Sequence, residues 1–240
     1  MAEAFGWGAL GASALLIGAL IAYQLSPSRG VIAVVMALGT GLLIGSVSFE
    51  LVDEALKTQT VAWVALLVLV GAAVFTVGDW LLTRHGGGQR KNATGTQAEG
   101  SPLAIVLGSV LDGVPESFVL GLTVLQGGVS VSLLAGVVLS NLPEGMSSSS
   151  GLKAAGWPRG RVVLMWSAVA VVSAVSAAAG YVVLDPASGR TGALVQAFAG
   201  GALLAMLADT LLPEAYKVEG VLTGPLVVVG FAISLALSAI

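Results

Sequence analysis

Two segments of the chain combine an acidic or amide side chain, a proline and a glutamate inside an apolar stretch. Residues 110–117 read V-L-D-G-V-P-E-S, and residues 138–145 read V-L-S-N-L-P-E-G. A carboxylate in a membrane-spanning stretch is unfavourable, and so is a proline inside a helix. Because this unfavourable combination occurs twice, we interpret the two segments as the halves of a paired cation site.

The spacing of the side chains places the candidate ligands on matching faces of two helices. Asp112 and Glu116 are four residues apart, so they share one helix face. On the other helix, Ser140 and Asn141 lie four and three residues before Glu144. We therefore predict that Asp112, Glu116, Asn141 and Glu144 bind the ion and that Ser140 assists them.

The two prolines add carbonyl oxygens to this ligand set. Pro115 has no N–H for the carbonyl of Leu111, and Pro143 has none for the carbonyl of Leu139. Carbonyls freed in this way coordinate ions in the broken helices of transporters. Such oxygen ligands suit Mg, Mn and Fe(II) and also accept Zn, although the His and Cys residues that favour zinc are absent from both segments.

Further acids lie near the ends of two other apolar stretches. They are Glu50, Asp53 and Glu54 in one stretch and Asp209 and Glu214 in the other. Without Lys or Arg at the same depth, buried acids stay protonated or pair with a cation. We interpret these acids as the entry to the paired site and the exit from it. The alternative is that they are ordinary solvated helix ends.

The composition is that of an integral membrane protein. Of the 240 residues, 56% are hydrophobic and 10% are charged, and the mean hydropathy is +0.97. A net charge of −3 argues against a nucleic-acid partner, and the lack of cysteine excludes disulfides and thiolate ligands. We predict an all-α integral membrane protein with a single transmembrane domain over residues 1–240.

Apolar runs of about the length needed to cross a bilayer, roughly 20 residues, recur along the chain. They predict eight transmembrane helices, at about 5–25, 31–55, 60–83, 102–125, 129–151, 160–184, 191–215 and 221–240. The connections between them are short, except for a polar and Gly-rich loop over 84–101.

The basic residues gather in alternate connections between these predicted spans. Eight of the ten fall on one side, namely Arg29, Arg84, Arg90, Lys91, Lys153, Arg159, Arg161 and Lys217. Only Lys57 and Arg190 fall on the other. Because cytoplasmic loops are enriched in Lys and Arg, we expect both termini to be extracellular and the 84–101 loop to be cytoplasmic. The expected location is the cell membrane (plasma or inner).

The end of the second predicted span resembles the end of the seventh. Residues 49–57 read F-E-L-V-D-E-A-L-K, and residues 210–217 read T-L-L-P-E-A-Y-K, so that Glu54-Ala55 aligns with Glu214-Ala215. The two spans have opposite orientations. We therefore predict an inverted 3+2+3 repeat, an arrangement frequent in transporters.

These residues resemble the ZIP (Zrt/Irt-like protein) family of divalent metal transporters. The most specific likeness lies in N-L-P-E-G at 141–145, D-G-V-P-E-S at 112–117 and L-L-P-E-A at 211–215. Span order, orientation and the position of the long loop extend it over essentially the whole chain. The resemblance implies eight spans, external termini and a metal site, often binuclear in the family, between the fourth and fifth spans.

The resemblance also implies a role for each candidate ligand. Glu116 and Glu144 match the motif glutamates that bridge metals, and Asn141 matches a metal-ligating Asn. Asp112 stands at the position of the usual first His, and Ser140 at the equivalent position of the fifth span. The implied function is transport of a divalent cation (Zn, Mn, Fe or Cd) toward the cytoplasm, without a cofactor or enzymatic activity. The family also often forms homodimers.

The chain departs from the family pattern because both motif histidines are absent. Gly113 offers no side chain at its motif position, Ser117 replaces the motif glycine, and the span at 160–184 has no carboxylate for a second metal. We therefore expect one bound ion rather than two, and zinc specificity does not follow from the motif.

Three other functions remain open. The same acids would serve a proton or monovalent-cation pathway, which the lost histidines favour. The weakened motif also suits a non-transporting membrane protein that senses a metal or binds a partner. An intramembrane hydrolase would use paired carboxylates as acid and base, but the single histidine, His85, lies in the 84–101 loop, which argues against an enzyme.

Overall fold

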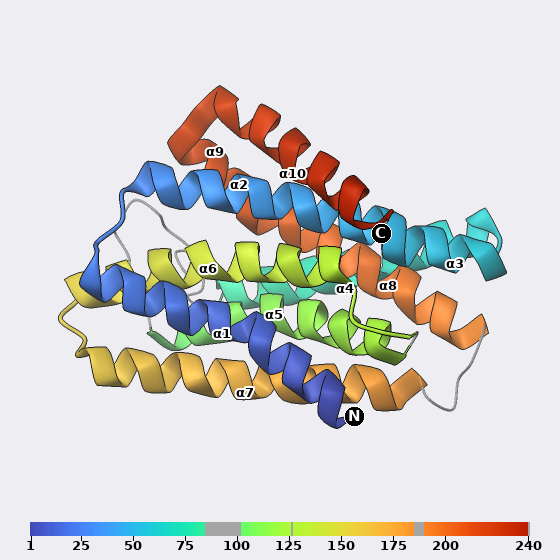
Figure 1. Cartoon of the computed structure of the whole chain (residues 1–240), viewed down its shortest axis with the longest axis horizontal. Helices are drawn as coiled ribbons and strands as arrows, with labels where there is room; N and C mark the ends of the chain where they lie inside the picture. Colours follow the sequence, from blue (N-terminus) through green and yellow to red (C-terminus); the bar gives the residue numbers. More distant parts are fainter. Residues whose placement is uncertain (85–101, 126, 185–189, 240) are drawn as a thin grey trace.

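The structure is a computed structural model that describes residues 1–84, 102–125, 127–184 and 190–239 (Figure 1). Nearly all of the 84–101 loop, with His85, lies outside the described residues. Almost every described residue belongs to a helix, and no strand occurs among them. The all-α prediction is therefore confirmed.

The helices are long rods that run back and forth along the long axis of the molecule (Figure 1). Their bounds are α1 (Ala2–Gln24), α2 (Arg29–Ser46), α3 (Asp53–Thr58), α4 (Val61–Leu82), α5 (Pro102–Leu125), α6 (Val131–Ala154), α7 (Arg159–Leu184), α8 (Arg190–Met206), α9 (Leu212–Glu219) and α10 (Thr223–Leu237). A π-helical segment, η1 (Val47–Val52), joins α2 to α3, and a second, η4 (Leu207–Leu211), joins α8 to α9. Each range predicted as a span coincides closely with one of these helices or continuous rods.

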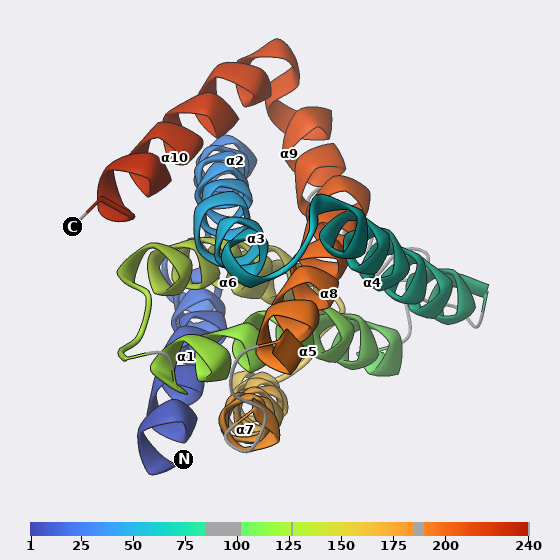
Figure 2. The ribbon, with the colours of Figure 1, turned by 90° about the vertical axis from the view of Figure 1, so that its right-hand side faces the viewer.

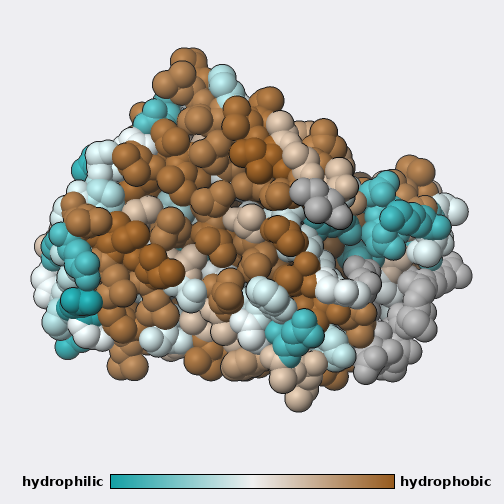
Figure 3. Space-filling model, in the orientation of Figure 1, coloured by the Kyte–Doolittle hydropathy of each residue, from teal (hydrophilic) through white to brown (hydrophobic). Residues whose placement is uncertain are grey.

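Six helical stretches of the described residues are long and apolar enough to cross a membrane. One of them, Thr191–Leu237, covers the range predicted as the seventh span and most of the eighth, because the 3-10 turn η5 (Gly220–Leu222) joins α9 to α10 without a non-helical residue, although the chain changes direction there. Helix α6 is not among the six; it carries Asn141, Glu144 and four consecutive serines, which lower its hydropathy. On the face seen in Figure 3, apolar side chains cover most of the middle, and many of the hydrophilic ones lie toward the two ends. The protein is therefore a multi-pass helical membrane protein.

The polar helix α6 lies inside the bundle. It packs along α1 and α2, while α5 packs along α7 (Figure 2). The rods of α4 and α10 lie outside, against α8 and α2 respectively. This arrangement lets α6 keep its polar residues because neighbouring helices cover most of its surface.

Four helix pairs cross at reciprocal glycines. The pairs are Gly18 with Gly145 (α1 and α6), Gly121 with Gly180 (α5 and α7), Gly41 with Gly230 (α2 and α10), and Gly71 with Gly201 (α4 and α8). At every crossing, a Cβ on either glycine would strike a backbone carbonyl oxygen three residues before the partner glycine. Small residues of this kind let membrane helices approach at backbone distance.

The two π segments occupy matched positions. The segment η1 begins at Val47, and η4 begins at Leu207. The sequence alignment that pairs Glu54 with Glu214 also pairs these two starting residues. In both segments an N–H bonds to the carbonyl five residues earlier: Asp53 to Ser48, and Leu212 to Leu207. A π segment of this kind appears frequently at functional sites.

We expect Gly201→Leu to destabilise the protein, because its side chain would meet the carbonyl of Val68 on α4. Overpacking of a tight contact costs about 1–3 kcal/mol. The measurement is thermal unfolding of the purified protein in detergent. Gly6→Leu is the matched control, since a Cβ on Gly6 meets nothing within 4 Å. Equal melting temperatures for the two variants would contradict the crossing.

Candidate cation site

The five predicted ligands are buried in the middle of the bundle. Asp112 and Glu116 lie on α5, and Ser140, Asn141 and Glu144 lie on α6; none is more than 5% exposed. Within the described ranges, the buried charged side chains are all Asp or Glu, and no Lys, Arg or His is buried. The centre of the bundle therefore concentrates negative charge or protonated carboxyls.

Two hydrogen bonds join α5 to α6 at this level. Ser109 Oγ donates to Glu144 Oε1 at 2.6 Å. Ser140 Oγ donates to Glu116 Oε1 at 3.2 Å, and it shares its single proton with the Val137 carbonyl of its own helix at 3.0 Å. The two backbones come close over only a short stretch, and these bonds bridge the helices there. Each motif glutamate is thus held by a hydroxyl of the opposite helix.

Ser109 is a site residue that the sequence reasoning missed. It precedes Asp112 by three residues and Glu116 by seven, so all three lie on one face of α5. A search for hydroxyls at this spacing from the acids would have found it.

Asn141 is directed at α1. Its Nδ2 donates to the backbone carbonyl of Gly11 at 3.2 Å. The amide nitrogen is therefore committed to α1, and Oδ1 is the atom that Asn141 would offer to an ion.

Both prolines lie within continuous helices. The carbonyl of Leu139, which loses its helical donor, lies against α2, where a Cβ on Gly39 would come within 2.7 Å of it. This expected ligand is therefore covered by a neighbouring helix. On the other side of the bundle, Ser176 of α7 donates to the carbonyl of Val114 at 2.8 Å, directly before the proline of α5.

The three acids do not close around one point. No group of three or more His, Cys, Asp or Glu side chains in the described parts of the chain is arranged to hold a metal ion. Asp112, Glu116 and Glu144 are gathered between two helices, but an ion there would need the oxygens of Ser140 and Asn141 as well. Carboxylate groups alone therefore do not form a metal site in the described residues.

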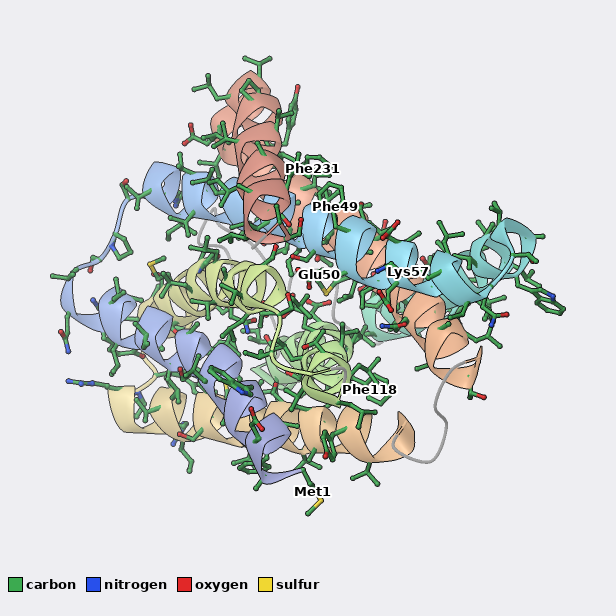
Figure 4. All side chains as sticks on the ribbon, turned by 45° about the vertical axis from the view of Figure 1, so that its right-hand side comes forward. Met1, Phe49, Glu50, Lys57, Phe118 and Phe231 are labelled. Atoms are coloured by element: carbon green, nitrogen blue, oxygen red, sulfur yellow. The ribbon has the colours of Figure 1, made fainter. Side chains whose placement is uncertain are left out.

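Two of the three expected entry acids share a pocket at the end of the bundle where α3 lies. The pocket has a volume of about 400 Å³ and is lined by Phe49, Glu50, Glu54, Thr123, Gly127, Gly128, Val129 and Ser130. The hydroxyl of Ser130 lies within hydrogen-bonding reach of the Glu50 carboxylate. The ring of Phe49 packs against Phe231 of α10 with centroids 5.2 Å apart, while Glu50 is directed into the bundle (Figure 4).

The third expected entry acid, Asp53, is exposed. Its Oδ2 lies 4.0 Å from Lys57 Nζ, and the same ammonium lies 2.6 Å from Glu54 Oε2. Asp53 therefore belongs to a surface charge cluster and does not line the pocket.

The expected exit acids also separate. Glu214 is buried and accepts a hydrogen bond from Ser147 Oγ of α6 at 3.2 Å. Asp209 lies in η4 and is exposed. Of the two expected exit acids, only Glu214 therefore lies against α6.

Serine–glutamate contacts follow α6 from one end to the other. In order, they are Glu50 with Ser130, Glu116 with Ser140, Glu144 with Ser109, and Glu214 with Ser147. The α6 backbone rises about 25 Å between Ser130 and Ser147, which is close to the roughly 30 Å of a bilayer's hydrocarbon core. The polar line thus crosses most of the bundle.

Comparison with models of known protein families and with curated proteins finds no match to this chain.

We expect Ser109→Ala to destabilise the protein, because the buried carboxylate of Glu144 would lose the hydrogen bond from Ser109. Loss of one partner of a buried hydrogen bond costs about 1–3 kcal/mol. Thermal unfolding of the purified protein measures the effect. Ser150→Ala is the control, since among the described residues Ser150 Oγ bonds to Met146 O of its own helix and joins no other helix. A larger loss for the control variant would argue against the link.

Proposed function

We propose that the protein is a ZIP-like transporter that moves a divalent cation of the Zn, Mn, Fe or Cd class across the cell membrane toward the cytoplasm. Asp112, Glu116, Asn141 and Glu144 would bind the ion, and Ser140 would assist. The observation that carries the proposal is the burial of these acids between α5 and α6 with no buried base among the described residues. In an apolar bundle, such acids are neutralised by protons or by a bound cation.

The arrangement of the helices supports eight spans and an inverted 3+2+3 repeat. The repeat exchanges α1 with α7, the α2–α3 rod with the α8–α9 rod, α4 with α10, and α5 with α6. Under this exchange, the α1–α6 crossing becomes the α7–α5 crossing. The same exchange turns the α2–α10 crossing into the α8–α4 crossing. The matched π segments obey the same relation. In this proposal α6 spans the membrane although it is polar, because α1 and α2 shield it from lipid.

The proposed ion path includes fewer acids than the sequence predicts. Glu50 and Glu54 form the entry, since they line one pocket, and Glu214 forms the exit, since it contacts Ser147 of α6. Asp53 and Asp209 are exposed and lie off this path. The serines along α6 offer hydroxyl oxygens between the acids.

The direction of transport rests on the distribution of basic residues. We call the basic end the end of the bundle that holds Arg29, Arg84, Lys153, Arg159, Arg161 and Lys217. All six lie at the start or end of helices that meet there (Figure 1). We propose that this end faces the cytoplasm, which leaves both termini outside. Arg90 and Lys91 lie outside the described residues.

We expect Asp112→Ala and Glu144→Ala each to lower uptake of the transported metal at least tenfold in cells or proteoliposomes. Each variant removes a buried oxygen ligand. Asp53→Asn is the matched control and should keep wild-type uptake, because Asp53 is exposed and off the path. Normal uptake by both alanine variants, with folded protein present, would refute the assignment. Loss of uptake by the control as well would point to a general effect of surface charge.

A direct binding measurement identifies the ion. We expect saturable binding of at least one of Zn, Mn, Fe(II), Cd and Mg to the purified protein, and its loss in Glu116→Ala/Glu144→Ala. Absence of binding for every divalent ion would favour a proton or monovalent-cation pathway, or a protein that does not transport. The serine-bonded glutamates and the lack of a three-acid cluster in the described residues are what favour the proton or monovalent alternative. A homodimer remains a prediction, as does the absence of enzymatic activity.

A further inference from the structure

A second pocket lies away from the cation path, at the elbow between α9 and α10. Gly220, with φ of 58°, allows the chain to reverse there, and the two helices diverge from this point (Figures 1 and 2). The elbow pocket has a volume of about 520 Å³ and is lined by Leu212, Pro213, Tyr216, Val221, Thr223 and Gly224. Its size falls within the range of about 300–1,000 Å³ that small-molecule sites occupy.

The elbow pocket faces the surroundings of the bundle. Val221 is 80% exposed and Tyr216 is 56% exposed, so its rim is apolar and open. Glu214 belongs to the same helix as Tyr216, but it is buried and bonds to Ser147 on the inner side of α9. The pocket and the cation path therefore lie on opposite faces of α9.

The elbow lies at the basic end. Lys217 is exposed on the last turn of α9, directly after Tyr216. The end of α9 lies beside the start of α2, since a Cβ on Gly30 would come within 2.9 Å of Glu219 Oε1. Glu219 is thus placed against α2. At a membrane interface, Tyr lies at headgroup level and a Lys side chain extends its ammonium toward the headgroups.

We propose that the elbow pocket binds one acyl chain of an anionic phospholipid, whose headgroup phosphate pairs with Lys217. The apolar lining gains by covering its surface with the chain, and the basic end supplies the charge complement. This inference rests on the membrane character of the protein and on the pocket. It does not depend on cation transport.

The first test fills the pocket without disturbing the fold. A Cβ on Gly224, in the first turn of α10, meets nothing within 4 Å, so Gly224→Leu extends into open space. Gly160→Leu is the matched control, because Gly160 is also open and lies in the first turn of α7 at the same end. Native mass spectrometry of the purified protein with added phosphatidylglycerol measures bound lipid. We expect about tenfold weaker binding for Gly224→Leu and wild-type binding for Gly160→Leu.

The second test addresses the headgroup. Wild-type protein should bind phosphatidylglycerol at least several-fold more tightly than phosphatidylcholine, and Lys217→Gln should remove that preference. Lys57→Gln, at the other end of the bundle, should leave it unchanged. Val221→Ser, which makes the rim polar without adding bulk, replaces Gly224→Leu if that variant fails to fold, and it should also weaken binding. Equal binding of the two lipids by the wild type, or undiminished binding by the pocket variants, would overturn the proposal.

Discussion

The central constraint on this protein is that four acids are buried in an apolar bundle without a buried base in the described part of the chain. Glu116, Glu144 and Glu214 each accept a hydrogen bond from a serine, and Asp112 is buried on α5, one turn before Glu116. An unsatisfied carboxylate at this depth would be strongly unfavourable. The position of α6 follows from this requirement, because α6 carries or receives every one of these serine–glutamate bonds.

Enclosing a polar helix in this way requires its neighbours to approach closely. The reciprocal glycines provide that approach, since α1 meets α6 at backbone distance through Gly18 and Gly145. On the opposite side of α6, Gly39 of α2 covers the carbonyl that Pro143 leaves free. Most of the exposed large apolar side chains then lie on α4, α7 and α10. The buried polar helix α6 and the close backbone packing of its neighbours therefore depend on each other.

The two ends of the polar line are built from similar parts. The rod of α2, η1 and α3 brings Glu50 to Ser130, and the rod of α8, η4 and α9 brings Glu214 to Ser147. Each rod contains a π segment shortly before or at its acid. A one-residue change in helical winding redirects the side chains that follow it. The rod of α8, η4 and α9 also ends at the elbow pocket, which lies on the face of α9 turned away from Ser147.

The sequence by itself determined the helices and the burial of the motif acids. Hydropathy and local spacing specify both, so the eight apolar ranges coincide with helical rods, and Asp112 shares a face with Glu116. Only the tertiary structure decided which way each helix faces. It directed Asn141 to Gly11, brought Ser109 to Glu144, and left Asp53 and Asp209 exposed. These outcomes depend on how each rod is rotated about its axis against its neighbours, which distant glycine crossings and π segments set, and no local pattern records that rotation.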